Sequence, residues 1–302
     1  PTPARNRERR LGNQAAFSFL RLLSPIACSH LNHECGVDDG GSPVARTWEF
    51  CTLGGIGASK QVFFFASTVC APWHLTPKSG TSMNVRDSIL LINTNRMLPP
   101  IAPVGLDYVA EAVARSGHVV EVADLALAED PTTELRDRLA HSRPTLVGLT
   151  FRNVDDCFWP SGRSFLPALE TQLKVVRDAT DAPIVLGGVG FSIFAEAIVR
   201  RTGVEFGVLG DGVVAIPAIL SALRGSITFD DVPGLIWHEG KRLRANPPAW
   251  PRELHVPTGR SFIDNATYFE RGGQIGIETK RGCDRACIYC PDRLAKGTRT
   301  RL

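Results

Sequence analysis

The stretch Ser88-Ile89-Leu90-Leu91-Ile92-Asn93-Thr94 contains four consecutive apolar residues and opens the regular part of the chain. A strand with one face in water alternates apolar and polar residues, whereas a parallel strand is covered by helices on both faces. The continuous apolar run therefore predicts a parallel strand inside an α/β domain.

Further short apolar segments follow this stretch, and each is separated from the next by a segment with helical periodicity. The predicted strands are Ser88–Thr94, His118–Ala123, Thr145–Phe151, Pro183–Leu186 and Phe206–Leu209. Strands that alternate with helices are typical of βαβ units, which place the strands in parallel. The sequence therefore predicts a doubly wound sheet of five parallel strands.

The segments between the predicted strands carry apolar residues three and four positions apart, as helices packed on a sheet do. Gly117 is expected to end the first helix, and Asp130 followed by Pro131 is expected to begin the second, which runs to about His141. The apolar positions are Leu106, Val109, Ala110 and Val113, then Leu166, Leu169, Leu173 and Val176, then Phe194, Ala197 and Ile198, and finally Ile216, Ile219, Leu220 and Leu223.

A hairpin and a linker are predicted after the last of these helices. Gly234–Arg244 has the pattern of a β-hairpin that turns at Glu239-Gly240. Residues 245–272 contain several prolines and predict an interdomain linker. We therefore expect one domain over residues 83–228, a hairpin and linker over 229–272, and the start of a second domain over 273–302.

Three cysteines follow a short β-like run in the last of these parts. Cys283, Cys287 and Cys290 have the spacing C-x3-C-x2-C. Cubane iron–sulfur clusters are normally held by four thiolates. Three thiolates on one loop can hold three irons and leave the fourth open for a chelating substrate, as catalytic metal sites keep one position open. Neighbouring lysine and arginine side chains favour the thiolate form that binds metal.

This motif resembles the signature of radical S-adenosylmethionine (SAM) enzymes, C-x3-C-x-aromatic-C, with Tyr289 at the aromatic position. The resemblance implies a 4Fe–4S cluster on Cys283, Cys287 and Cys290. It also implies that SAM chelates the open iron, with Tyr289 near the adenine.

Zinc is the alternative metal in two places. The three cysteines could form a structural knuckle with His238 or His255 as the fourth ligand. Potential zinc ligands also lie between Cys28 and Cys35, but their spacing matches no common zinc finger. The β-like run, the glycine and the aromatic residue around the three cysteines favour the iron–sulfur interpretation.

The order of the parts extends the resemblance over about residues 86–296. A flavodoxin-like domain, a hairpin marked Val232-Pro233-Gly234, a linker and the cysteine loop together resemble the cobalamin-dependent radical SAM enzymes. Gly187 and Gly188 match the Gly-Gly that lies along the cobalamin nucleotide tail in that family. Gly210-Asp211-Gly212 takes the place of its usual Gly-Glu-Gly. The resemblance implies a cobalamin site outside the carboxyl ends of the strands, where open α/β sheets bind ligands.

The chain departs from the family pattern at the lower face of the cobalt. Many cobalamin domains carry D-x-H-x-x-G after the first strand, and its histidine ligates cobalt, but residues 93–98 contain no histidine. Several radical SAM members also lack it. We predict that Arg152 and Asn153, after the third strand, contact the cofactor, although a guanidinium cannot ligate cobalt. The alternative for Arg152 is an ion pair with Asp155 or Asp156.

The resemblance implies a methyltransferase that passes a methyl group from SAM to cobalt and then to an unactivated carbon or phosphorus. It implies a small-molecule or peptide substrate and an electron donor such as flavodoxin or ferredoxin. We expect the 302-residue chain alone to be inactive, because a radical SAM barrel needs more chain than follows the linker. The alternative from another class is a non-catalytic corrinoid- or nucleotide-binding module with a structural metal knuckle.

The composition of the chain limits which kinds of partner and which cellular compartment are expected. A formal charge of +3 without a long basic run does not suggest nucleic acid. No apolar segment reaches the ~20 residues that cross a bilayer, so no membrane is expected. Eight cysteines in a chain of this size predict metal binding in a reducing cytoplasm rather than a disulfide framework.

Residues 1–82 differ from the rest of the chain. They show no sustained helical or strand period, and Met83 is the first methionine in a sequence that begins with Pro1. We expect Met83 to be the natural start and residues 1–82 to be an irregular extension, either upstream sequence outside the native coding sequence or a poorly ordered segment. We also expect these residues to be dispensable for folding.

Overall fold

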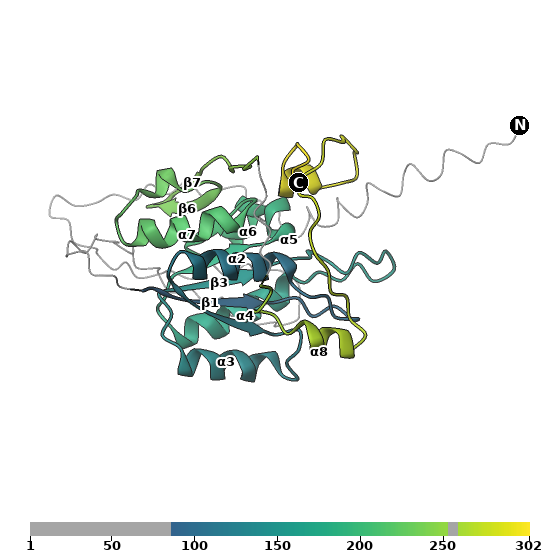
Figure 1. Cartoon of the computed structure of the whole chain (residues 1–302). Helices are drawn as coiled ribbons and strands as arrows, with labels where there is room; N and C mark the ends of the chain where they lie inside the picture. The colour runs from purple at the N-terminus through teal and green to yellow at the C-terminus, as the bar shows by residue number, and fades with distance from the viewer. Residues whose placement is uncertain (1–85, 253–258) are drawn as a thin grey trace, which may run out of the picture. The chain divides into compact units, whose positions relative to one another are not determined.

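The computed structural model describes residues 86–252 and 259–302, which contain a sheet in the order β2-β1-β3-β4-β5-β6-β7 (Figure 1). The parallel strands are β1 (Ser88–Asn93), β2 (Val119–Asp124), β3 (Leu146–Thr150), β4 (Ile184–Gly187) and β5 (Phe206–Val208). Their order is one of the two common orders of doubly wound sheets. The predicted α/β fold with a mainly parallel sheet is confirmed.

Helices cover both faces of this sheet (Figure 1). The main ones are α2 (Val104–Arg115), α3 (Pro131–His141), α4 (Leu166–Ala179), α6 (Ala195–Thr202) and α7 (Gly212–Leu223). Leu90 and Ile92 of β1 belong to a core shared with α3, α4 and α6, whereas Ile89 and Leu91 belong to a core shared with α2 and α7. None of these four side chains is more than 2% exposed, which explains the continuous apolar run.

Local signals placed the helix ends well in the first half of the domain. Asp130 caps α3 by accepting hydrogen bonds from the backbone N–H groups of Thr132 and Thr133, each at 3.1 Å. The predicted helix around Phe194 is instead two helices, α5 (Val189–Ile193) and α6, with Phe194 between them. The first turn of α5 donates backbone hydrogen bonds to the carbonyls of residues 151 and 152.

The five predicted parallel strands and the predicted hairpin are present, but the sheet of the described residues has seven strands rather than five. The hairpin strands β6 (Leu235–Glu239) and β7 (Arg242–Ala245) extend the same sheet, because β6 pairs antiparallel with β5. Leu235 and Trp237 are buried against the sheet edge. The hairpin thereby satisfies backbone groups of β5 that would otherwise form an open edge.

The predicted linker is also more structured than expected. It contains the short helix α8 (Asn265–Glu270), whose Tyr268 is fully buried beside Ala102 and Ile263. Residues 253–258, which include His255, lie outside the described residues. The described part of the linker therefore packs against the α/β domain rather than acting as an open spacer.

The β-like run before the cysteines does not form a strand in the described structure. Gln274 makes one isolated parallel bridge with Ile101, and Ile277 after it is 73% exposed. A strand needs a hydrogen-bonded neighbour along its length, and between Gln274 and the cysteines the described structure has only isolated bridges, at Gln274 and at Arg281. The following helix, α9 (Asp292–Lys296), comes directly after the last cysteine and Pro291.

The predictions for residues 1–82, including the potential zinc ligands from Cys28 to Cys35, concern residues outside the described ranges. Within the described ranges, each helix is too short or too polar to cross a bilayer.

A buried polar network joins α8 to the sheet. The Tyr268 hydroxyl donates to the carboxylate of Asp124 at 2.9 Å, and the Asn93 amide donates to the same carboxylate at 2.7 Å. Burial raises the pKa of Asp124, although both hydrogen bonds act in the opposite direction. Asp124 therefore binds a proton more readily in the folded chain, and this contribution to stability is present at low pH and lost as the pH rises from the ordinary carboxyl pKa through the raised one.

Replacing Tyr268 with Phe should lower the free energy of unfolding by about 1–3 kcal/mol at pH 7, because a partly buried carboxylate loses a donor. The loss should shrink as the pH falls and Asp124 takes up a proton. Urea unfolding at several pH values measures both effects. Phe269→Ala is the matched control on the same helix, because Phe269 is 71% exposed and should change stability little. Equal losses for the two variants would contradict the role of the network.

Candidate functional site

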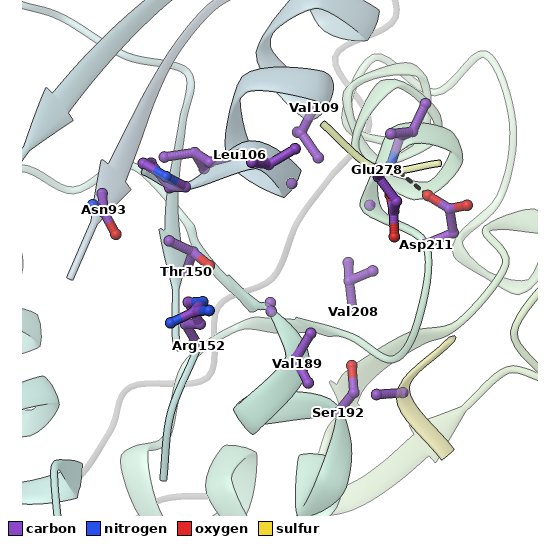
Figure 2. A pocket seen from close by; sticks show the side chains of 18 of the residues that line it. Asn93, Leu106, Val109, Thr150, Arg152, Val189, Ser192, Val208, Asp211 and Glu278 are labelled. Atoms are coloured by element: carbon purple, nitrogen blue, oxygen red, sulfur yellow. Dashed lines mark hydrogen bonds between the residues drawn. The ribbon is translucent and has the colours of Figure 1, made fainter. Parts of the chain in front are cut away.

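A cavity of about 430 Å³ lies at the carboxyl ends of β3, β4 and β5. Its wall also includes the start of α2 and residues 274–278 of the segment that precedes the cysteines. Figure 2 shows Thr150 and Arg152 on one side of the cavity and Glu278 and Asp211 on the other. This is the edge where doubly wound sheets bind ligands, and the volume is ordinary for a ligand site.

The two glycines after β4 have different roles. A Cβ atom at Gly187 would have no neighbour within 4 Å, so this residue borders open space in the cavity wall. A Cβ atom at Gly188 would lie 2.8 Å from the carbonyl oxygen of Phe151, and its φ of 104° disfavours other residues. Gly187 therefore leaves room for a ligand, whereas Gly188 lets two backbone segments pack closely.

The Gly210-Asp211-Gly212 turn lines the cavity, but neighbouring side chains crowd its glycines. A Cβ atom at Gly210 would lie 2.7 Å from the ring of Trp250, and one at Gly212 would lie 3.0 Å from Val109. Asp211 caps α7 by accepting a hydrogen bond from the backbone N–H of Val213 at 3.2 Å. The turn is therefore fixed by packing and by a helix cap.

Asp211 also forms an ion pair with the cysteine segment. Its carboxylate lies 2.7 Å from the guanidinium of Arg281, which in turn lies 2.6 Å from Glu278. Burial disfavours the charge on Arg281, but the hydrogen bond with Glu278 and the charge of Asp211 outweigh it and raise the pKa of Arg281. Arg281 thus stays charged between two carboxylates at the cavity wall.

Arg152 lines the cavity, whereas Asn153 is not among the lining residues. The Arg152 guanidinium donates to the side-chain oxygen of Asn153 at 3.2 Å. Among the ion pairs of the described residues, none joins Arg152 to Asp155 or Asp156. Burial lowers the pKa of Arg152 below its ordinary high value. A charged group without a carboxylate partner therefore lies at the end of β3.

The cysteines are not gathered into a metal centre in the part of the chain that the structure describes. Cys287 and Cys290 are exposed, Cys283 is half-buried, and Tyr289 is 86% exposed. No group of three His, Cys, Asp or Glu side chains within the described ranges is placed to hold a metal ion. The structure thus carries the predicted thiol donors on one loop without showing their arrangement around a metal.

Several residues of the cavity wall escaped the sequence reasoning. Trp250 comes from the Pro-rich linker, Lys296 from α9, and Glu278 and Arg281 from the segment before the cysteines. The glycines carried a motif signal, but these side chains lie far from the strand ends in sequence. The charged residues before the cysteines are the only local signal in the sequence for these side chains, and we interpret that signal in the sequence as favouring the thiolate form of the cysteines.

Comparison with known proteins gives an independent view of the same region. The B12 binding domain family matches residues 92–220. The chain is 32% identical over 265 residues to tryptophan 2-C-methyltransferase of Streptomyces laurentii, which covers 70% of this chain and 44% of the relative. Hopanoid C-3 methylase of Methylococcus capsulatus is 27% identical over 197 residues, 63% of this chain and 36% of that protein.

Solved structures of cobalamin-dependent enzymes that use SAM also match this chain. The structure of the radical S-adenosylmethionine methyltransferase TsrM from Kitasatospora setae, with cobalamin and a [4Fe-4S] cluster bound, matches with a TM-score of 0.64 and 32% identity. The match covers 72% of this chain and 43% of TsrM. The cobalamin-dependent S-adenosylmethionine radical enzyme OxsB matches at 18% identity with a TM-score of 0.58, which supports the fold alone.

The chain spans less than half the length of the relatives named here. The B12-binding match covers strands β2 to β5, the end of β1 and the helices from α2 to most of α7, and its residues include the cavity wall from Leu106 to Ile216. The similarity to tryptophan 2-C-methyltransferase and TsrM extends beyond that domain, since it covers 70% and 72% of the chain. The chain therefore belongs to the family of cobalamin-dependent radical SAM enzymes and contains its B12-binding domain.

Proposed function

We propose that the chain binds cobalamin in the cavity at the strand ends and belongs to a methyltransferase that uses cobalamin and SAM. The observation that carries this proposal is the open cavity wall at Gly187, inside the segment that matches the B12-binding family. Tryptophan 2-C-methyltransferase and TsrM support the reaction class. The activity is proposed for the whole protein, because the chain spans 44% of the first of these relatives.

The cavity residues fit a bulky, mostly apolar ligand with polar edges. The start of α2 and β5 present Leu106, Val109 and Val208 to the cavity, and Thr150 and Ser192 add hydroxyl groups. Glycine backbone at Gly187 lets a flat ring system approach without a side chain in between. This mixture of an apolar wall and few polar groups is typical of cofactor sites.

Arg152 is proposed to lie under the lower face of the cofactor. Its guanidinium has no lone pair to donate, so it cannot ligate cobalt and would disfavour another donor there. When bound, cobalamin supplies a cobalt centre that carries a methyl group from SAM to an acceptor. We propose an unactivated carbon or phosphorus centre as the acceptor, in a small molecule or peptide.

The cysteine loop is proposed to hold a 4Fe–4S cluster through Cys283, Cys287 and Cys290, with SAM nearby and Tyr289 at its adenine. An external electron donor such as flavodoxin or ferredoxin would reduce it. The support is the C-x3-C-x-aromatic-C spacing and the [4Fe-4S] cluster of TsrM.

A large side chain at position 187 should block the cofactor. Gly187→Leu should weaken hydroxocobalamin binding at least about tenfold, or 1.4 kcal/mol, because the new side chain would project into the cavity. Gly187→Ala should have a smaller effect. Absorbance titration measures the affinity, and thermal unfolding without cobalamin should change little for either variant. Unchanged affinity in the Leu variant would count against this site.

The state of the cobalt tests the role of Arg152. Cob(II)alamin bound to the chain should give an electron paramagnetic resonance spectrum without nitrogen superhyperfine splitting, because we propose that the cofactor's own base is detached and no histidine is among the described lining residues. Arg152→Ala should alter this spectrum, while Arg152→Lys keeps the charge and should alter it less. Nitrogen splitting in the unsubstituted chain would refute the assignment, and identical spectra for all three proteins would remove Arg152 from it.

The remaining alternative is a non-catalytic corrinoid-binding module with a structural zinc knuckle. Anaerobic reconstitution should give the chain iron and sulfide with a brown chromophore, even if the yield is low. Replacing Cys283, Cys287 and Cys290 with Ala together should abolish iron binding but leave cobalamin binding intact. Stoichiometric zinc without sulfide in the unsubstituted chain would favour the module.

A further inference from the structure

Four charged side chains meet where the α/β domain touches the cysteine segment. Arg281 pairs with Asp211 at 2.7 Å and with Glu278 at 2.6 Å, and Arg301 lies 3.7 Å from the same oxygen of Asp211. The exposed fractions of these side chains run from 4% for Arg301 to 20% for Glu278. The cluster has two positive and two negative groups, so its net charge is zero.

The two arginines form the base of the cysteine loop. The backbone N–H of Arg281 donates to the carbonyl of Arg301 at 3.0 Å, and the N–H of Arg301 donates back to Arg281 at 2.9 Å. All three cysteines lie between these paired residues. A single carboxylate on the α/β domain, that of Asp211, therefore contacts both ends of the loop.

Trp250 and the glycines leave this base little freedom. The guanidinium of Arg301 lies 5.3 Å from the centre of the Trp250 ring. A Cβ atom at Gly210 would lie 2.7 Å from that ring, and one at Gly297 would lie 2.9 Å from it. The ring is thus packed between the turn of the α/β domain and the end of α9.

The charged cluster and the proposed cofactor site share a wall. Asp211, Glu278, Arg281 and Trp250 all line the cavity that Gly187 borders. Figure 2 shows Asp211 and Glu278 on the same side of this cavity, with a hydrogen bond drawn to the Asp211 carboxylate. A ligand that fills the cavity would therefore contact members of the charged cluster.

We propose that Asp211 is a positioning residue that anchors the cysteine loop through Arg281 and thereby links cobalamin binding to the order of that loop. The second part of this proposal, the link to cobalamin binding, rests on the proposed function. Since linkage is reciprocal, a bound ligand that favours the anchored loop must bind more weakly when the anchor is lost.

The substitution Asp211→Asn removes the ion pair with Arg281 but keeps a side chain that can cap α7. Asparagine caps helices about as well as aspartate, so α7 keeps its cap. Among the described residues, Arg281 then keeps only Glu278 as a carboxylate partner and Arg301 loses its ion pair, so largely buried positive charge is less well compensated. Glu170→Gln is the matched control, because it removes a carboxylate that pairs with Arg201 at 2.7 Å far from the cavity wall.

Hydrogen–deuterium exchange of the 302-residue chain without cobalamin tests the anchor. The amides of Arg281, Cys283 and Arg301 are hydrogen-bonded within the loop, and Asp211→Asn should speed their exchange at least about fivefold. Amides of β1 should not change in the same sample, which excludes global unfolding. Arg281→Lys keeps a positive charge beside Asp211 and should exchange more slowly than Arg281→Met. Equal loop exchange in the unsubstituted chain and Asp211→Asn would overturn the proposal.

Repeating the exchange with hydroxocobalamin tests the linkage. Cobalamin should slow exchange of these loop amides in the unsubstituted chain and in Glu170→Gln, and should do so much less in Asp211→Asn. The dissociation constant should also rise in Asp211→Asn, by no more than the factor by which cobalamin slows loop exchange in the unsubstituted chain. Binding of equal strength with equal protection in both proteins would disprove the linkage. Failure of the unsubstituted chain to bind cobalamin would instead refute the proposed function and the linkage with it, while the ligand-free comparison still decides the anchor.

Discussion

Burial of both faces of the parallel sheet is the constraint on which the rest of the structure depends. Ile89, Leu90, Leu91 and Ile92 have almost no exposed surface, and alternate residues enter different cores. Because helices cover both faces, only the ends of the strands remain open to a ligand. The cavity therefore lies at the carboxyl edge, where backbone turns and loop residues form the wall.

The glycines at this edge show how one residue type serves different physical needs. Gly188 and Gly210 have left-handed φ values and no space for a side chain, so they allow close packing of backbone and of the Trp250 ring. Gly187 has space around it and borders the cavity. A glycine motif therefore marks the right edge of the sheet, but only some of its members leave room for a ligand.

Polar groups hold the later segments against the α/β domain. Tyr268 reaches the buried pair Asn93 and Asp124, and Arg281 reaches Asp211. In both cases a residue after the hairpin contacts the α/β domain, either at the ends of strands or at the start of a helix. The described segments after the hairpin thus belong to the cavity wall in structure, although the sequence assigns them to a linker and a second domain.

The sequence by itself determined the parallel strands, most of their helices, the Asp130 cap and the edge of the sheet that holds the cavity. These features depend on local periodicity, on capping chemistry and on the geometry common to βα units, so they can be read from neighbouring residues. Only the tertiary structure decided that the hairpin joins the sheet, that Gly187 and Gly188 differ, and that Asp211 pairs with a residue 70 positions away. Such contacts depend on which distant segments meet, and side-chain burial and charge then select the pairs. No local pattern records that choice.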